Sequence, residues 1–157
     1  MNDGPKVRRV QSVNIYERIG CNAIMNVVER HIFKRYIRTT GASIKNRGMH
    51  ELKAYIEKDI ELDPEGTKYC YKFDIKKFYE SIDQDFMMYA LRRMFKGKVL
   101  LTMLERFVRM MPSGLSIGLR SSQGFGNLLL SMFLDHYLKD NIGVKHFYRY
   151  CDDGVVL

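Results

Sequence analysis

The spacing of apolar side chains changes along the chain, and this change limits the fold to a mixture of helices and strands. Apolar residues recur every three or four positions over residues 15–37 and 49–60, which predicts two helices. Aromatic residues at positions 69, 71 and 73 then alternate with smaller or polar ones, which predicts a strand ending at Asp74. Helical spacing returns over residues 84–95, 99–111 and 128–138.

The C-terminal residues 146–157 predict a β-hairpin. The sequence Cys151-Asp152-Asp153-Gly154 lies between aromatic and β-branched runs, and Asp-Gly in that setting is typical of a hairpin turn. The order of helices, strand, helices and hairpin favours an α+β fold with an antiparallel sheet and helices packed on one face. The second strand of the hairpin holds only residues 155–157, so we expect the chain to be a fragment of a longer protein.

The charge of the chain favours a polyanionic partner. Its 157 residues carry a formal net charge of +8, and residues 1–58 hold 12 Lys and Arg against 5 Asp and Glu. Basic excess of this kind is typical of proteins that bind nucleic acid or nucleotides. Residues 59–157 are nearly balanced, so catalytic carboxylates are expected there.

Neither a membrane segment nor a disulfide scaffold is expected. The N-terminal residues lack the apolar stretch of a secretory signal, and the most apolar window, residues 125–134, is shorter than the roughly 20 residues of a spanning helix. The three cysteines are not spaced as zinc ligands. We therefore expect a soluble, cytoplasmic protein with no membrane partner.

Three carboxylates could meet at one edge of the predicted sheet. Asp74 ends one strand, while Asp152 and Asp153 lie at the tip of the hairpin. If the two strands are neighbours, this cluster offers the hard oxygen ligands that suit Mg²⁺. The alternative is purely structural, because Asp-Asp-Gly is an ordinary turn sequence and Asp74 could cap a helix.

Four segments resemble, in order and spacing, the palm motifs of bacterial reverse transcriptases. They are FDIKKFYESID, GLSIGLRSSQ, GNLLLSMFLDHYLKD and YRYCDDGVVL, which begin at residues 73, 114, 126 and 148. The resemblance is greatest to enzymes of diversity-generating retroelements and their group II intron-like relatives. It implies a right-hand polymerase with a basic fingers region at residues 1–68 and an incomplete palm at residues 69–157, without a thumb.

The resemblance implies an RNA-directed DNA polymerase that uses two Mg²⁺ ions, with Mn²⁺ as a substitute. Asp74, Asp152 and Asp153 would be catalytic and would bind the metal, assisted by the backbone carbonyl of Ile75. The implied partners are an RNA template, a DNA or RNA primer and a dNTP, together with an accessory protein or the missing thumb. A bacterial or phage origin is implied as well.

The same resemblance assigns residues to the incoming nucleotide. Tyr79 would lie beneath the sugar and exclude a 2′-hydroxyl, although without the resemblance its context favours a core tyrosine packed beside Phe78. The loop residues Gly118, Ser122 and Gln123 would contact the nascent base pair, and the alternative is a flexible surface loop. Upstream, SIKNRGMH at residues 43–50 resembles a triphosphate-binding motif, in which Arg47 and Lys45 would neutralise phosphate charge. Its alternative is a solvated turn.

Template binding is assigned to the basic residues Arg18, Arg30 and Lys34, which otherwise would form a solvated helix face. Arg8 and Arg9 add to the same basic excess. Two other functions stay open: a metal-dependent nuclease, and a nucleic-acid-binding module without catalysis. Because the thumb is missing, we expect the chain alone to extend a primer poorly or not at all.

Overall fold

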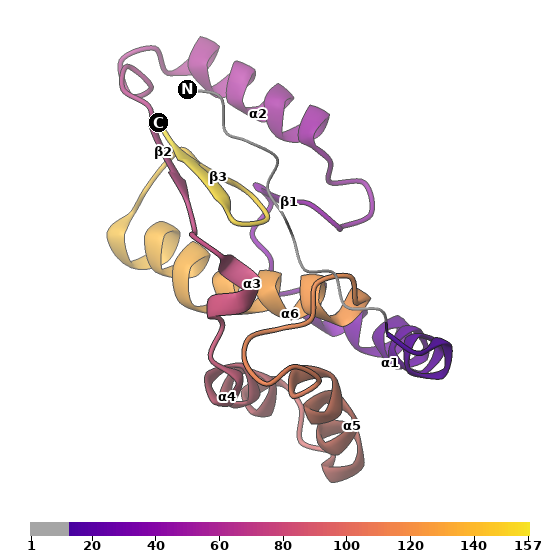
Figure 1. Ribbon diagram of the computed structural model, residues 1–157. Coiled ribbons are helices and arrows are strands. Elements are labelled where there is room, and N and C mark those ends of the chain that lie inside the picture. The colour runs from indigo at the N-terminus through magenta and orange to yellow at the C-terminus, as the bar shows by residue number, and fades with distance from the viewer. Residues whose placement is uncertain (1–12) are drawn as a thin grey trace.

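The computed structural model describes residues 13–157, and the predicted α+β class is confirmed (Figure 1). Arg8 and Arg9 lie outside the described residues. The N-terminal half contains α1 (Ile15–Phe33), β1 (Thr40–Gly41), α2 (Met49–Leu62) and β2 (Tyr71–Asp74). The middle contains α3 (Phe78–Ser81), α4 (Gln84–Met94), α5 (Lys98–Val108) and α6 (Arg120–Leu130). The last part contains η1 (Ser131–Asp135), η2 (Tyr137–Ile142), β3 (Phe147–Tyr150) and β4 (Asp153–Val156).

The four strands form one mixed sheet in the order β1-β3-β4-β2. The hairpin of β3 and β4 is confirmed, and β2 pairs antiparallel with β4. The prediction of a wholly antiparallel sheet is wrong at one edge, because β1 pairs parallel with β3. This strand has only two residues, Thr40 and Gly41, so it is too short to produce an alternating pattern in the sequence.

Helices contact both faces of the sheet, whereas the sequence predicted one face. Adjacent residues of a strand point to opposite faces. Arg149 of β3 hydrogen-bonds to Asn127 and Asp135 on the side of α6 and η1, while the Tyr148 hydroxyl reaches Asp59 of α2. The two faces therefore carry different elements: α6 with η1 on one side and α2 on the other, as Figure 1 shows.

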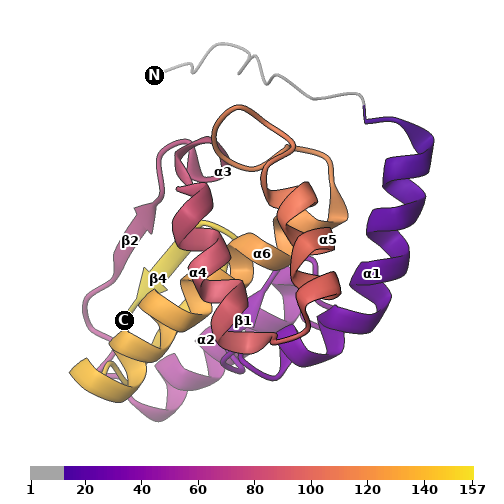
Figure 2. The same ribbon diagram turned by 90° about the horizontal axis from the view of Figure 1, so that it is seen from below.

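The core lies between α1, α4, α5 and α6 (Figure 2). Met25 and Val28 of α1 and Phe125 and Leu128 of α6 are almost fully buried. The two helices approach closely at Gly124, where an added Cβ would lie 2.8 Å from Met25 Cε. Residues from both sides of the predicted boundary near residue 68 share this core, and the division into fingers and palm stays a prediction.

Several helix boundaries differ from the prediction, most clearly those of α1 and α6. α1 ends at Phe33 rather than near residue 37, because the backbone N–H groups of Arg35 and Tyr36 bond to carbonyls three residues back and tighten the chain into turns. α6 begins at Arg120 rather than near residue 128, and its first turns contain serines and glycines of low helix propensity. Within residues 13–157, no helix has both the length and the apolar character that crossing a membrane requires.

A candidate active site at the end of β2 and the β3–β4 turn

The sheet register brings two of the predicted catalytic carboxylates together. Asp74, the last residue of β2, is the direct partner of Asp153, the first residue of β4. Directly opposed residues of antiparallel strands have Cα atoms about 4.5–5.5 Å apart and side chains on the same face. Both aspartates are exposed, and Asp152 lies half-buried in the turn between β3 and β4. The segments that the sequence predicted to meet are therefore adjacent.

The glycine after the two aspartates is required by packing. The ring of Phe73 lies over Gly154, and a Cβ added at Gly154 would approach three ring carbons at 2.1, 2.3 and 2.6 Å. On the same face the ring stacks at 6.4 Å on Phe147. This close approach of β2 to β4 depends on the absence of a side chain at residue 154.

Tyr79 lies beside the turn that carries Asp152. The left-handed backbone of Lys77, with φ 51°, turns the chain from β2 into α3, which carries Phe78 and Tyr79. The Tyr79 hydroxyl is 3.3 Å from Cys151 Sγ, and its ring lies 5.1 Å from that of Phe78. Burial and the contact with Cys151 raise the pKa of Tyr79 well above its ordinary range, so the hydroxyl stays neutral. Tyr79 thus packs beside Phe78 and also touches the hairpin turn.

Ile75, whose backbone carbonyl was assigned to the metal, follows Asp74 directly. Its side chain is partly buried and packs against the hydrophobic core. This anchor fixes the chain immediately after the strand-end carboxylate.

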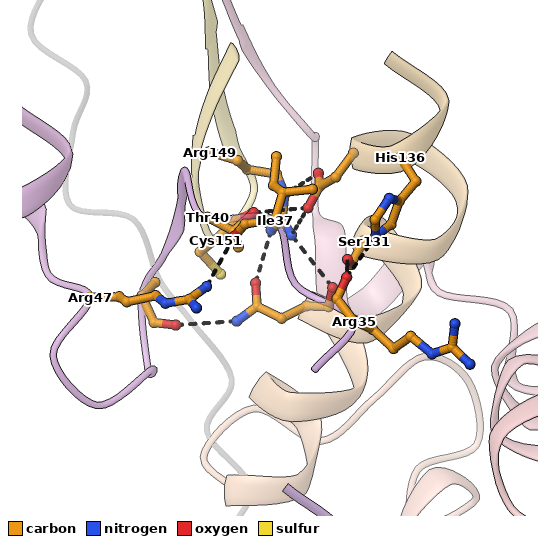
Figure 3. A network of polar contacts seen from close by, with 11 residues as sticks. Arg35, Ile37, Thr40, Arg47, Ser131, His136, Arg149 and Cys151 are labelled. Carbon is orange, nitrogen blue, oxygen red and sulfur yellow. Dashed lines mark hydrogen bonds and ion pairs between the residues drawn. The ribbon is translucent and has the colours of Figure 1, made fainter. Parts of the chain in front are cut away.

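A buried ion pair lies directly behind the turn (Figure 3). The Arg149 guanidinium donates from Nε to Asp135 Oδ1 and from Nη2 to Asp135 Oδ2, both at 2.7 Å, and both side chains are fully buried. Thr40 Oγ1 donates to Asp135 Oδ2 at 2.9 Å, and Asn127 Oδ1 accepts from Arg149 Nη1 at 2.8 Å. Arg149 Nη1 also donates to the carbonyl of Cys151. The network therefore connects β1, α6, η1 and β3 to the turn.

Sequence reasoning missed this network, although one signal was present. Arg149 lies two residues after Phe147, so the alternation of a strand places it on the same, buried face. Asp135 is a second charged residue in apolar surroundings, because it directly follows the apolar run of residues 125–134. A charged residue at a position that periodicity assigns to the interior predicts a buried partner of opposite charge.

Two of the predicted nucleotide-binding residues, Lys45 and Gln123, line a polar cavity of about 280 Å³. Its wall includes Glu29 and Arg120, which form a two-point ion pair at 2.8 and 2.5 Å. The cavity is closed on one side by Tyr36, whose hydroxyl donates to the carbonyl of Gly124 at 3.1 Å. It is lined in full by Glu29, Phe33, Tyr36, Ser43, Lys45, Arg120, Gln123, Gly124 and Asn127.

The two other loop residues lie outside this cavity wall. Gly118 is exposed, and its φ of 107° is a backbone conformation that glycine adopts readily. Ser122 is buried within α6, and in the described part of the chain its hydroxyl has no hydrogen-bond partner. Ser122 therefore differs from Gln123, which is exposed.

Arg47 has a role within its own loop. Its Nη1 donates to the carbonyl of Ile37 at 3.0 Å, and its backbone carbonyl accepts from Ala42 at 3.3 Å (Figure 3). These contacts close the loop that precedes α2. Arg47 is therefore half-buried and holds the turn together, which differs from the solvated turn given as the alternative, and Lys45 is the basic residue of this motif that lines the cavity.

The residues predicted to bind template lie on or next to α1. Arg18 and Arg30 are exposed on the helix, and Lys34 is exposed at its C-terminal cap. Arg30 and Lys34 are four residues apart, which places them on the same side. The basic surface is thus on the element that forms one wall of the cavity through Glu29 and Phe33.

The donor set suits a hard cation that takes few protein ligands. In the region from residue 13 onward, no group of three or more His, Cys, Asp or Glu side chains is arranged to hold a metal ion. Asp74 and Asp153 nevertheless form an exposed carboxylate pair by register. Mg²⁺ commonly binds one or two carboxylates and completes its shell with water and substrate phosphates, so the chemistry of this pair fits it.

Comparison with known proteins adds no family. No protein-family model matches the chain, and no curated protein matches it. Its function is therefore inferred from its residues and their geometry.

Proposed function

We propose that this chain is the fingers and palm part of an RNA-directed DNA polymerase. The observation that carries the proposal is the pairing of Asp74 with Asp153, which joins a strand-end carboxylate to an Asp-Asp turn. Three further features support it: the contact of Tyr79 with the turn, the cavity lined by Lys45 and Gln123, and the exposed basic residues of α1 and its cap. The four polymerase-like segments also contact one another, through the pairs Tyr79–Cys151, Leu115–Tyr79 and Arg149–Asn127.

In the proposed reaction a primer 3′-hydroxyl attacks the α-phosphate of a dNTP. The new P–O bond forms as the bond to the β-phosphate breaks, pyrophosphate leaves, and the hydroxyl proton passes to solvent. Asp74, Asp152 and Asp153, with the carbonyl of Ile75, would hold Mg²⁺, which when bound offsets phosphate charge and favours the deprotonated hydroxyl. Tyr79 excludes a ribose 2′-hydroxyl by its bulk, and its neutral hydroxyl stays on Cys151. Lys45 offers one positive charge to the phosphates. The protein contributes mainly orientation and charge neutralisation.

Template binding in this proposal uses the exposed basic residues of α1. Arg18, Arg30 and Lys34 would contact phosphates and give affinity without sequence preference. Such binding weakens as the salt concentration rises, because counterions compete for the phosphates.

Primer extension tests the proposal. The protein is given an RNA template, an annealed DNA primer, dNTPs and Mg²⁺ or Mn²⁺, and incorporation is compared between the wild type, Asp74→Asn and Asp152→Asn. Because weak extension is expected of this chain, addition of the first labelled nucleotide is measured, and we expect both variants to lose this addition by at least a hundredfold. Glu65→Gln is the matched control, because Glu65 is an exposed carboxylate in the loop before β2, whereas Asp74 lies at the other end of that strand. Equal incorporation by Asp74→Asn and the wild type would refute the assignment.

A second candidate is a nucleic-acid-binding module without catalysis. It is favoured by one observation, that residues 13–157 contain no three-ligand metal group. In that case the wild type binds primer and template in a filter assay with a steep salt dependence, yet adds no nucleotide. A metal-dependent nuclease is recognised in the primer-extension assay, because it shortens the labelled primer instead of extending it.

A further inference from the structure

The guanidinium of Arg149 holds the peptide bond that leads into Asp152. Arg149 is fully buried at β3, and its Nη1 donates to the carbonyl of Cys151. This carbonyl belongs to the peptide that joins Cys151 to Asp152. Its orientation therefore sets the direction in which the backbone enters Asp152.

The guanidinium itself has little freedom to move. Asp135 accepts two hydrogen bonds from it, and Asn127 accepts one at its side-chain oxygen at 2.8 Å and one at its backbone carbonyl at 3.4 Å. The acceptors are themselves held, since Thr40 donates to Asp135 and Asn127 donates to the carbonyl of Ala42 at 3.2 Å (Figure 3). A rigid, planar fork of donors in this setting fixes its acceptors more tightly than a flexible ammonium group could.

The turn needs an external restraint. Cys151 has φ 57°, a left-handed conformation that a residue with a Cβ seldom adopts. Such conformations persist where surrounding contacts hold them. The bond from Arg149 to the carbonyl of Cys151 is a restraint of this kind.

We propose that Arg149 is a positioning residue that acts through the Cys151 carbonyl to fix the backbone at Asp152, and with it the Asp152 carboxylate beside the Asp74–Asp153 pair. The catalytic role of these carboxylates rests on the proposed polymerase function, whereas the hydrogen bond from Arg149 to the Cys151 carbonyl does not. Through Asn127, the same guanidinium also connects the turn to α6, the helix that carries Gln123.

The test removes the guanidinium without leaving a buried charge behind. Arg149→Met combined with Asp135→Leu replaces the whole ion pair by apolar side chains, a change that proteins often tolerate. Ser131→Ala is the matched control, because it removes one hydrogen bond of a buried side chain, from Ser131 Oγ to the carbonyl of Arg35, and leaves the contact between Arg149 and Cys151 in place. Circular dichroism establishes that each variant is folded.

Two measurements follow the turn. The affinity for Mn²⁺ alone is measured by electron paramagnetic resonance, and the order parameter of the Asp152 amide is measured by ¹⁵N relaxation. We expect the paired variant to bind Mn²⁺ about 10–100-fold more weakly, as is typical when a partner behind a metal ligand is lost. Its Asp152 amide order parameter should fall from about 0.85 to below about 0.6. Ser131→Ala should change neither quantity.

The outcomes separate this proposal from the proposed function. A folded paired variant with unchanged Mn²⁺ affinity and an unchanged Asp152 amide overturns the positioning role. If Asp74→Asn binds Mn²⁺ as the wild type does, the polymerase assignment fails, and the amide order parameter alone decides the role of Arg149. Should the paired variant fail to fold, Arg149→Lys replaces it. The lysine keeps a positive charge beside Asp135 but presents a single ammonium group in place of the fork, so the same loss of order at Asp152 is expected.

Discussion

Replacing Gly154 by alanine tests whether β2 and β4 approach as closely as the site requires. An added Cβ would lie 2.1 Å from the nearest ring carbon of Phe73, whereas carbon atoms prefer about 3.5–4.0 Å. The ring must move by more than 1 Å, roughly, and this displaces it from its stack on Phe147. Overpacking of this size costs up to about 3 kcal/mol. Replacing glycine by alanine also lowers the conformational entropy of the unfolded chain, which stabilises the folded state by up to about 1 kcal/mol.

The net expectation for Gly154→Ala is therefore a loss of about 2 kcal/mol in the free energy of unfolding. For a domain of this size the melting temperature falls by roughly 4–8 °C, which calorimetry or circular dichroism measures. Gly20→Ala is the matched control with the opposite sign. Gly20 lies inside α1 with no atom within 4 Å of an added Cβ, so alanine should stabilise the helix by about 0.5–1 kcal/mol.

A double-mutant cycle identifies the cause. Phe73→Leu removes the ring atoms that the new Cβ would meet, so the cost of Gly154→Ala should fall by at least about 1 kcal/mol in that background. Additive effects of the two substitutions, or a Gly154→Ala variant as stable as the wild type, would refute the packing described for this turn.

Three further outcomes are expected. The hydrogen bond to Asp140 raises the pKa of His136 above its ordinary 6.5, so this contact contributes stability below pH about 6.5 that is lost as the pH rises through the higher folded value. His136→Gln should therefore flatten that part of a plot of melting temperature against pH. The hydrogen bond from Lys145 lowers the pKa of Asp63, so the ionised carboxylate stabilises the fold above pH about 3.8, and this stability is lost as the pH falls toward the lower folded value. Asp63→Asn should remove this acid-dependent loss of stability, which urea titrations measure. Lys45→Ala should raise the KM for dNTP several-fold in primer extension, and because Lys45 is exposed the melting temperature should stay unchanged. A change in kcat alone would contradict the assignment of Lys45 to the triphosphate.

The elements predicted best from sequence were those with strong local signals. The Asp-Gly turn gave the hairpin of β3 and β4, and the alternation of aromatic residues gave β2, with Asp74 at its end. α6 was only partly predicted, because close packing against Met25 and Phe78 favours glycines that lower helix propensity. Here tertiary contact, rather than local preference, determines where the helix begins.

Long-range contacts account for what the sequence did not predict. The parallel edge strand β1 has no periodicity of its own and depends on pairing with β3. The ion pair of Arg149 with Asp135 joins residues that each look like isolated charges in apolar surroundings. The pairing of Asp74 with Asp153 was expected only on condition that their strands were neighbours, since sequence spacing does not determine strand order.

The small strand β1 also has a consequence for the biogenesis of the protein. Thr40 is 95 residues away from its hydrogen-bond partner Asp135, and it pairs with Arg149 still further along the chain. Closing so long a loop is entropically costly, and contacts of this separation form slowly. During translation, the acidic turn cannot acquire its support until the ribosome has released residue 149. The nascent polypeptide is consequently without an assembled centre until that residue has been released.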